Sequence, residues 1–66
     1  MKLLIFRVSF QYSENTYCTN IVKALNERDV VREYSKYQWY SIQPATEYDL
    51  IEAEKKGMPV VMIKTA

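Results

Sequence analysis

A chain of 66 residues has room for one small domain, spanning residues 1–66, and its 48% hydrophobic residues suffice for a core, which excludes a disordered tail. Nine Lys and Arg against eight Asp and Glu leave a net charge of +1, which excludes a strong overall attraction for polyphosphates or anionic membranes. The sequence has no histidine, which excludes histidine-based catalytic triads and metal sites. It has one glycine, which excludes a glycine-rich phosphate-binding loop.

Residues 2 to 10 alternate with the period of a β-strand. Leu3 and Ile5 make one face of this strand partly apolar, so we expect the strand to be central in its sheet or covered by a partner. Arg7 interrupts the apolar run and no small-residue cleavage site follows, which favours a strand over a signal peptide. The opposite face is predicted to form the core, through Leu4, Phe6, Val8 and Phe10.

Two structures compete for residues 16 to 25. The apolar side chains have helical spacing, whereas the β-branched and aromatic composition is typical of a strand. Asn26 has the character of a helix N-cap, and Glu27 and Asp29 supply an acidic first turn. Because a helix that begins at residue 26 does not continue from an earlier one, we prefer a strand here, after a polar turn at residues 12 to 15.

An amphipathic pattern predicts a helix from residue 27 to about residue 37, with Val30, Val31 and Tyr34 on its apolar face. Residues 38 to 43 then read as a third strand. Pro44 is predicted to end that strand, because proline cannot donate a hydrogen bond to a neighbouring strand.

The second predicted helix, residues 47 to 56, has signals at both ends. Thr46 is the expected N-cap, and Gly57 supplies the left-handed residue that ends the helix. Its buried face is predicted to comprise Leu50, Ile51 and Ala53.

The final segment, residues 58 to 64, is predicted to be a strand, with its apolar run at residues 60 to 63. The order of elements is then ββαβαβ. This order predicts an α+β fold, a four-stranded, mostly antiparallel sheet with both helices packed on one face.

The chemistry-bearing residues do not point to an enzyme. Glu and Asp residues two apart on a helix point in different directions, so solvated helix faces account for them. Cys18 is either a nucleophile or a small buried thiol; we prefer the second, because no sequence-adjacent base accompanies it. We expect no metal, no cofactor and no small-molecule substrate. A single cysteine and no apolar stretch of about 20 residues favour a soluble, cytoplasmic protein.

The most unusual stretch is the junction between the first helix and the third strand, where four aromatic residues fall within seven positions. Strand alternation buries either Tyr40 or Trp39 and exposes the other. Exposed Tyr and Trp are typical of protein interfaces, although small domains also use aromatics to fill their cores. The predicted partner-binding residues are Tyr34, Lys36, Tyr37 and Trp39.

The sequence suggests two further kinds of interaction. Leu3 and Ile5, opposite the predicted core, are candidates for self-association as a homodimer. The alternative to protein binding is nucleic-acid binding, with the aromatics stacking on bases and basic side chains contacting phosphates. Acidic residues alternate with those basic residues and the net charge is small, so we rank nucleic-acid binding second. The basic residues concerned are Lys23, Arg28, Arg32 and Lys36.

Four stretches of the chain resemble short uncharacterised proteins encoded on conjugative transposons and prophage-like elements of Gram-positive bacteria. The resemblance covers most of the chain and implies an accessory protein of a mobile genetic element. It brings no catalytic or ligand-binding residue. Together with the composition, it leads us to expect a non-enzymatic protein-binding module whose partner is a host protein or a second copy. The stretches are SENTYCTN (13–20), YSKYQW (34–39), ATEYD (45–49) and KKGMPV (56–61).

Overall fold

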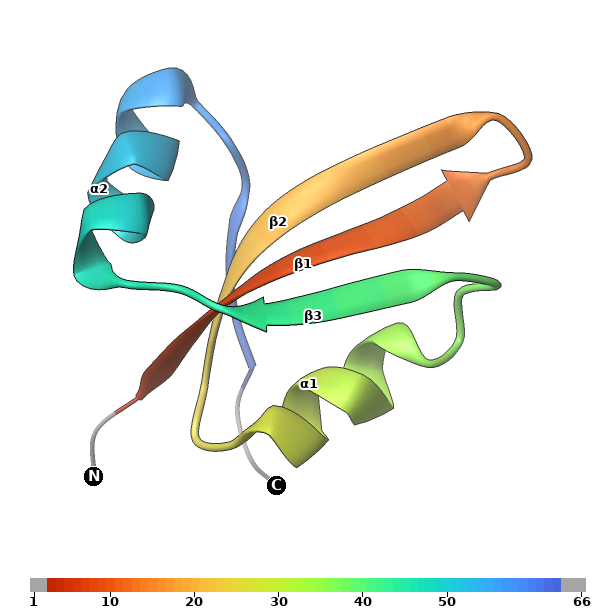
Figure 1. Cartoon of the computed structure of the whole chain (residues 1–66), viewed down its shortest axis with the longest axis horizontal. Coiled ribbons are helices and arrows are strands. Elements are labelled where there is room, and N and C mark those ends of the chain that lie inside the picture. Colours follow the sequence, from red (N-terminus) through yellow and green to blue (C-terminus); the bar gives the residue numbers. More distant parts are fainter. Residues whose placement is uncertain (1–2, 64–66) are drawn as a thin grey trace.

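The computed structural model describes residues 3–63. These residues form one β-sheet and two helices (Figure 1). The order of elements is ββαβαβ and the sheet is mostly antiparallel, which confirms the predicted α+β fold. The elements are β1 (Leu4–Ser13), β2 (Thr16–Ala24), α1 (Glu27–Tyr34), β3 (Tyr40–Pro44), α2 (Glu47–Lys56) and β4 (Val60–Met62).

The strands lie in the order β3-β1-β2-β4. β1 pairs antiparallel with both β2 and β3, and β4 adds to the far side of β2 as a parallel strand. Of the segment 16–25, for which sequence left two structures open, residues 16–24 form the strand β2, which pairs with nearly the whole of β1. Long-range pairing thus decides a segment whose local preferences conflict.

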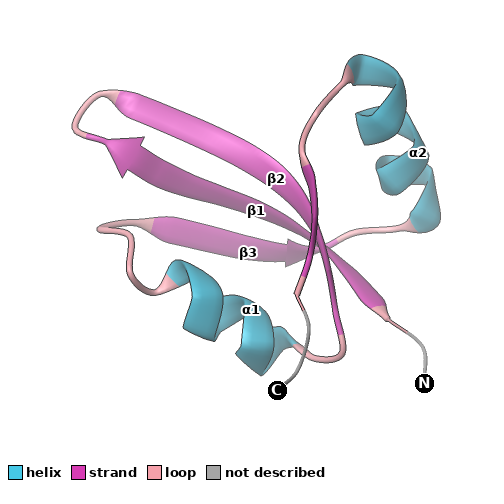
Figure 2. Cartoon of the chain, turned by 180° about the vertical axis from the view of Figure 1, so that it is seen from behind, coloured by secondary structure: helices cyan, strands magenta, loops and turns pink. Residues whose placement is uncertain are grey.

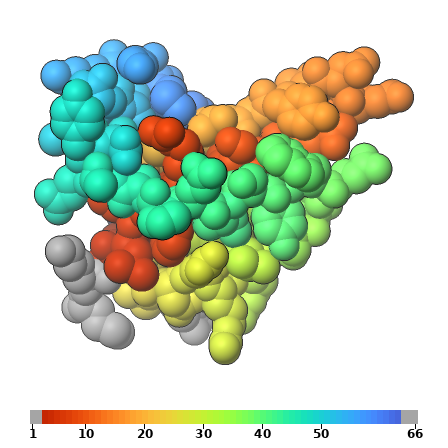
Figure 3. Space-filling view, viewed as in Figure 1, coloured from red at the N-terminus to blue at the C-terminus, as the bar shows by residue number. Residues whose placement is uncertain are grey.

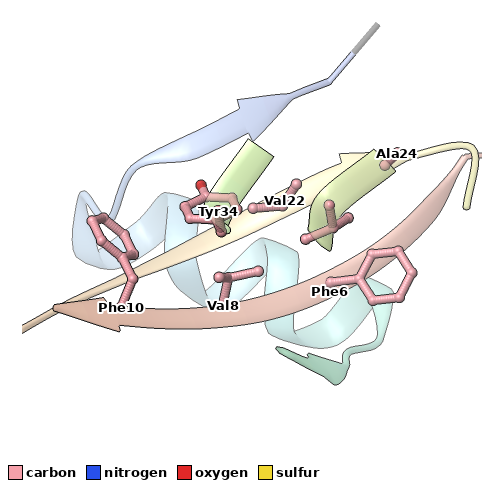
Figure 4. Close-up of a cluster of buried hydrophobic side chains, with 7 residues drawn as sticks. Phe6, Val8, Phe10, Val22, Ala24 and Tyr34 are labelled. Carbon is pink, nitrogen blue, oxygen red and sulfur yellow. The ribbon is translucent and has the colours of Figure 1, made fainter. Parts of the chain in front are cut away.

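One face of the sheet, which we call the α1 face, carries the main core (Figure 4). Residues directly opposite one another in the strand register share a face, so the alternate residues of β1 and β2 converge there. Phe6, Val8 and Phe10 are buried as predicted, whereas Leu4 is nearly half exposed. The cluster consists of Phe6, Val8, Phe10, Val22, Ala24, Val30 and Tyr34.

The helices lie on opposite faces of the sheet, so the prediction that both pack on one face is wrong. α1 supplies Val30 and Tyr34 to the main core. α2 packs on the other face, where Asp49 pairs with Arg7 at 3.3 Å and Ala53 is buried. In Figure 4 the pale-green pieces of α1 lie among the labelled side chains and the pale-cyan α2 lies behind the strands. We call this second face the α2 face.

Strand order explains why the helices separate. Because β2 and β3 are both antiparallel to β1, and β4 is parallel to β2, the strands β2, β3 and β4 all run in the same direction. The chain crosses the sheet from β2 to β3 through α1, passing β1, and then returns through α2 past β1 and β2 to β4 (Figure 2). Parallel crossovers have one preferred hand. Two crossovers of the same hand that run in opposite directions place their helices on opposite faces.

Several boundaries differ from the sequence prediction. α1 ends at Tyr34 rather than near residue 37, and the amide of Tyr37 donates to the carbonyl of Tyr34 at 3.1 Å in the turn that follows. The Tyr37 ring then packs on Phe10 with 4.6 Å between the ring centroids. β3 begins at Tyr40 and includes Pro44. β4 is shorter than predicted, and residue 64 lies outside the described residues.

α2 occupies the range predicted for it and has both predicted caps. The amide of Asp49 donates to the hydroxyl of Thr46 at 3.3 Å, and the carboxylate of Asp49 accepts from the amide of Thr46 at 2.9 Å. Gly57 ends the helix in the left-handed region at φ 74°. Ile51, however, is exposed rather than buried. Of the helices in residues 3–63, neither is long and apolar enough to cross a membrane.

Replacing Thr46 with alanine is expected to lower the free energy of unfolding by about 1 kcal/mol, because the Asp49 amide loses its capping acceptor. Urea denaturation at pH 7 measures this effect. Thr16→Ala, at the exposed start of β2, is the control and should leave the midpoint almost unchanged. Equal midpoints for the two variants would contradict the cap.

The same cap makes stability depend on pH. The hydrogen bond from the Thr46 amide, aided by Arg7, lowers the pKa of Asp49 below its ordinary value. A carboxylate whose pKa is lower in the folded state stabilises the fold above its unfolded pKa, about 3.9, and this contribution disappears as the pH falls through the folded pKa. We therefore expect the wild type to lose stability between about pH 5 and pH 2, and Asp49→Asn to lose less, when both are unfolded with urea at a series of pH values.

Candidate functional site

α2 covers only part of its face of the sheet, next to the N-terminal half of β1. Beyond Arg7 and Ile21, the same face continues as a surface of polar and aromatic side chains, most of them half-buried or exposed. The hydroxyls of Ser9 and Thr19 hydrogen-bond across the strands at 3.2 Å. We call this region the open sheet surface; by register it comprises Ser9, Gln11, Tyr17, Thr19, Trp39 and Ser41.

Two exposed aromatic rings contact each other on this surface, and we call Tyr17 and Trp39 the aromatic pair. Their ring centroids are 5.8 Å apart at 76°, an edge-to-face arrangement, although 64% of Tyr17 and 45% of Trp39 are exposed. Tyr17 belongs to β2 and Trp39 immediately precedes β3, so the rings meet across β1 at the level of Gln11. The amide of Gln11 donates to the carbonyl of Trp39 at 2.9 Å and holds the main chain there.

The aromatic pair lies at the end of the sheet that is far from α2. In Figure 3 the orange end of the hairpin and the green segment that leads into β3 lie side by side at the right, whereas the cyan α2 lies at the left. Tyr40, the residue after Trp39, packs against the main core. Of the two alternations that the sequence left open, the structure therefore has Tyr40 turned inward and Trp39 outward.

Tyr34, one of the predicted binding residues, belongs to the core. It is 4% exposed, and its ring lies 5.2 Å from that of Phe10. Its hydroxyl accepts a hydrogen bond from the side-chain amide of Asn20 at 3.0 Å. Burial raises the pKa of Tyr34 and the hydrogen bond from Asn20 opposes this, so the hydroxyl remains protonated at neutral pH. Tyr34 is therefore not available to a partner in the folded protein.

Lys36 and Tyr37 lie away from the aromatic pair, on the side of the core. The ammonium group of Lys36 is 5.5 Å from the centre of the Tyr37 ring and 3.6 Å from the carboxylate of Glu33. Both residues line a shallow hollow of about 700 Å³ between the end of the hairpin and the loop after α1. The four predicted binding residues thus occupy three places: the core, this hollow and the open sheet surface.

Tyr17 was not among the predicted site residues. Its alternation with Cys18 along β2 showed that the two side chains lie on opposite faces, but it did not show which face is covered. The partner of Trp39 becomes evident only from the register, which pairs Gln11 with Tyr17. Cys18 itself is half-buried and packs against the core cluster.

Leu3 and Ile5, the predicted self-association residues, lie beside α2. They line a groove of about 300 Å³ together with Leu50 and Ile51 of that helix. Both are half-buried. The prediction assumed that α2 covers the core face, and because α2 instead covers this side, Leu3 and Ile5 offer less free surface than expected.

The cations proposed as phosphate contacts do not gather around Trp39. Arg28 and Arg32 are exposed on α1, which covers the opposite face. Lys23 lies in the groove with Ile5 near the N-terminal end of β1. Within residues 3–63, no group of three or more Cys, Asp or Glu side chains is arranged to hold a metal ion.

Comparison of the chain with protein-family models, with curated proteins and with solved structures gives no match.

Proposed function

We propose that the chain is a non-enzymatic protein-binding module, an accessory protein of a mobile genetic element, and that it binds a host protein through the open sheet surface. The observation that carries this proposal is the aromatic pair. Tyr17 and Trp39 contact each other yet remain 64% and 45% exposed, on a part of the sheet that neither helix covers.

The aromatic pair has the properties of an interface anchor. Tyr and Trp bring a large apolar area at a low cost in conformational entropy, and they dominate the binding energy of many interfaces. The two rings already restrict each other, and the main chain at Trp39 is hydrogen-bonded to β1, so little freedom remains to be lost on binding. Ser9, Thr19 and Gln11 provide neutral hydrogen-bonding groups beside the rings.

The charge distribution favours a protein over a nucleic acid. Stacking of bases on aromatic rings gives useful affinity when a basic groove holds the phosphates as well. Lys36, the predicted cation nearest to Trp39 in sequence, contacts Tyr37 and Glu33 instead. Arg7, which does lie on the α2 face, is paired with Asp49.

Alanine at Trp39 or Tyr17 is expected to weaken partner binding by about 30-fold, the consequence of losing about 2 kcal/mol at an interface anchor. The partner is captured from a lysate of the natural host and then purified, and its affinity for each variant is measured by calorimetry. Tyr48→Ala is the matched control, because Tyr48 is an aromatic residue at least as exposed as Tyr17 and Trp39 but lies on α2. We expect this control to bind as the wild type does.

Two results would contradict the proposal. One is equal affinity of the partner for wild type, Trp39→Ala and Tyr48→Ala. The other is micromolar binding of single-stranded oligonucleotides at low salt that weakens steeply as salt rises and is lost in Trp39→Ala. That second result would establish nucleic-acid binding in place of protein binding.

A further inference from the structure

β4 forms one edge of the sheet of residues 3–63 and leaves part of its backbone unpaired. The carbonyl of Pro59 accepts from the amide of Ile21 at 3.1 Å, and the amide of Ile63 donates to the carbonyl of Lys23 at 2.9 Å. Alternate residues of a strand direct their amide and carbonyl groups to the same side. Residues 59, 61 and 63 therefore face β2, and Val60 and Met62 direct their amide and carbonyl groups outward.

Proline protects the edge at β3 but not the edge at β4. The amide of Gln11 donates to the carbonyl of Trp39, and the amide of Ala45 donates to the carbonyl of Ile5. In residues 39–45 the odd-numbered residues therefore direct their amide and carbonyl groups toward β1, and the even-numbered residues, Pro44 among them, direct theirs outward. Pro44 thus removes one outward donor from the β3 edge. Pro59 belongs to the set that faces β2, so its missing amide leaves the outer side of β4 intact.

We propose that two copies of this chain associate through their β4 strands, which pair antiparallel about a two-fold axis at Val61. In this register Val60 lies opposite Met62 of the second copy, and Met62 lies opposite its Val60. Each opposed pair exchanges two N–H···O=C hydrogen bonds, which satisfies all the outward groups of Val60 and Met62 in both copies. The pairing joins two four-stranded sheets into one continuous sheet.

The side chains and charges of this edge fit a second copy. Val60 and Met62 are 39% and 55% exposed on the α2 face, and each would pack beside its apolar counterpart across the axis. No charged side chain occurs from residue 57 to residue 63, so two identical edges meet without like-charge repulsion. An isologous interface requires this self-complementarity.

The dimer is independent of the proposed partner site. β4 lies beyond β2, whereas Trp39 precedes β3 at the opposite edge of the sheet. The experiment on host-protein binding can therefore give a negative result while the experiment on dimerisation gives a positive one, and the reverse also holds.

Sedimentation velocity over a concentration series tests the proposal on the full chain. We expect the wild-type mass to rise from one chain to two between about 1 μM and several hundred μM, a range that suits a short interface. Val60→Glu/Met62→Glu is expected to raise the dissociation constant at least about tenfold, because it places two carboxylates opposite each other at both opposed pairs.

Val60→Lys/Met62→Glu is the matched variant, and it should restore the dimer. It retains the Met62→Glu change and its proximity to Lys23 within the chain, but it places a lysine opposite each glutamate across the axis. Circular dichroism checks that both variants fold. Amide exchange adds a local measurement: the amides of Val60 and Met62 should exchange more slowly at high wild-type concentration, whereas that of Ile63, bonded to Lys23, should not change.

A wild-type chain that stays at the mass of one chain up to several hundred μM would overturn the proposal. A dimer that the two-glutamate variant leaves intact would also overturn it, as would failure of the lysine–glutamate variant to dimerise while folded. Slowed exchange at Val60 and Met62 only when an unrelated extended peptide is added would show that the edge serves another protein instead.

Discussion

Phe10→Ala is expected to destabilise the protein by about 3–5 kcal/mol and to leave much of it unfolded at 37 °C. Phe10 is buried, and its ring lies 5.2 Å from that of Tyr34 and 4.6 Å from that of Tyr37. Truncation removes the transfer free energy of the ring and leaves a cavity that β1 and α1 cannot close. Because a domain of this size rarely has more than about 3–5 kcal/mol to lose, this single change approaches its whole stability.

Urea denaturation and thermal melting by circular dichroism measure the Phe10 effect. Tyr12→Ala is the control, since Tyr12 lies two residues further along β1 but is exposed. We expect that control to cost less than about 0.5 kcal/mol. A Phe10→Ala variant that melts within a few degrees of the wild type would show that the packing of Phe10 on Tyr34 and Tyr37 is not part of the main core.

Ile21→Ala is expected to cost about 2–5 kcal/mol, although Ile21 lies on the face opposite the main core. Only 1% of Ile21 is exposed. It lies opposite Arg7 in the register and lines a pocket with Ala53 and Met58, residues of α2 and of the loop that follows it. The large effect follows because α2 makes a second, smaller core on this side of the sheet.

The control for Ile21 is Ile51→Ala, which removes the same side chain from an exposed position on α2. Exposed truncation should change the unfolding midpoint little. If Ile21→Ala were as mild as Ile51→Ala, α2 would not cover the sheet as the structure shows. The same pair of measurements therefore tests the placement of the two helices on opposite faces.

The features that sequence predicted well depend on neighbouring residues. The range of α2 follows from Thr46 and Gly57, whose caps act within one helical turn. The predicted α1 was about three residues too long at its C-terminal end, because its end depends on residues that are distant in the chain. Residues 35–43, which follow Tyr34, contain no glycine or proline that would end the helix. Its end is accompanied by packing of Tyr37 on Phe10, two residues that are far apart in the chain.

The candidate site was predicted in part. Trp39 was identified from the density of aromatics, and it is exposed on the sheet. Tyr34 was named for the same reason, but it is a core residue, because composition does not distinguish an aromatic that fills a core from one that serves a surface. Tyr17, the contact of Trp39, required the strand register.

By itself, the sequence determined the order of elements, the caps of α2 and the alternation of β1, because helix capping and strand periodicity depend on residues close together in the chain. Only the tertiary structure decided which helix covers which face. That choice depends on the strand order β3-β1-β2-β4, which arises from pairing between distant segments and from the preferred hand of the crossovers. The open sheet surface and the unpaired edge of β4 follow from that order, so neither could be located before the strands were paired.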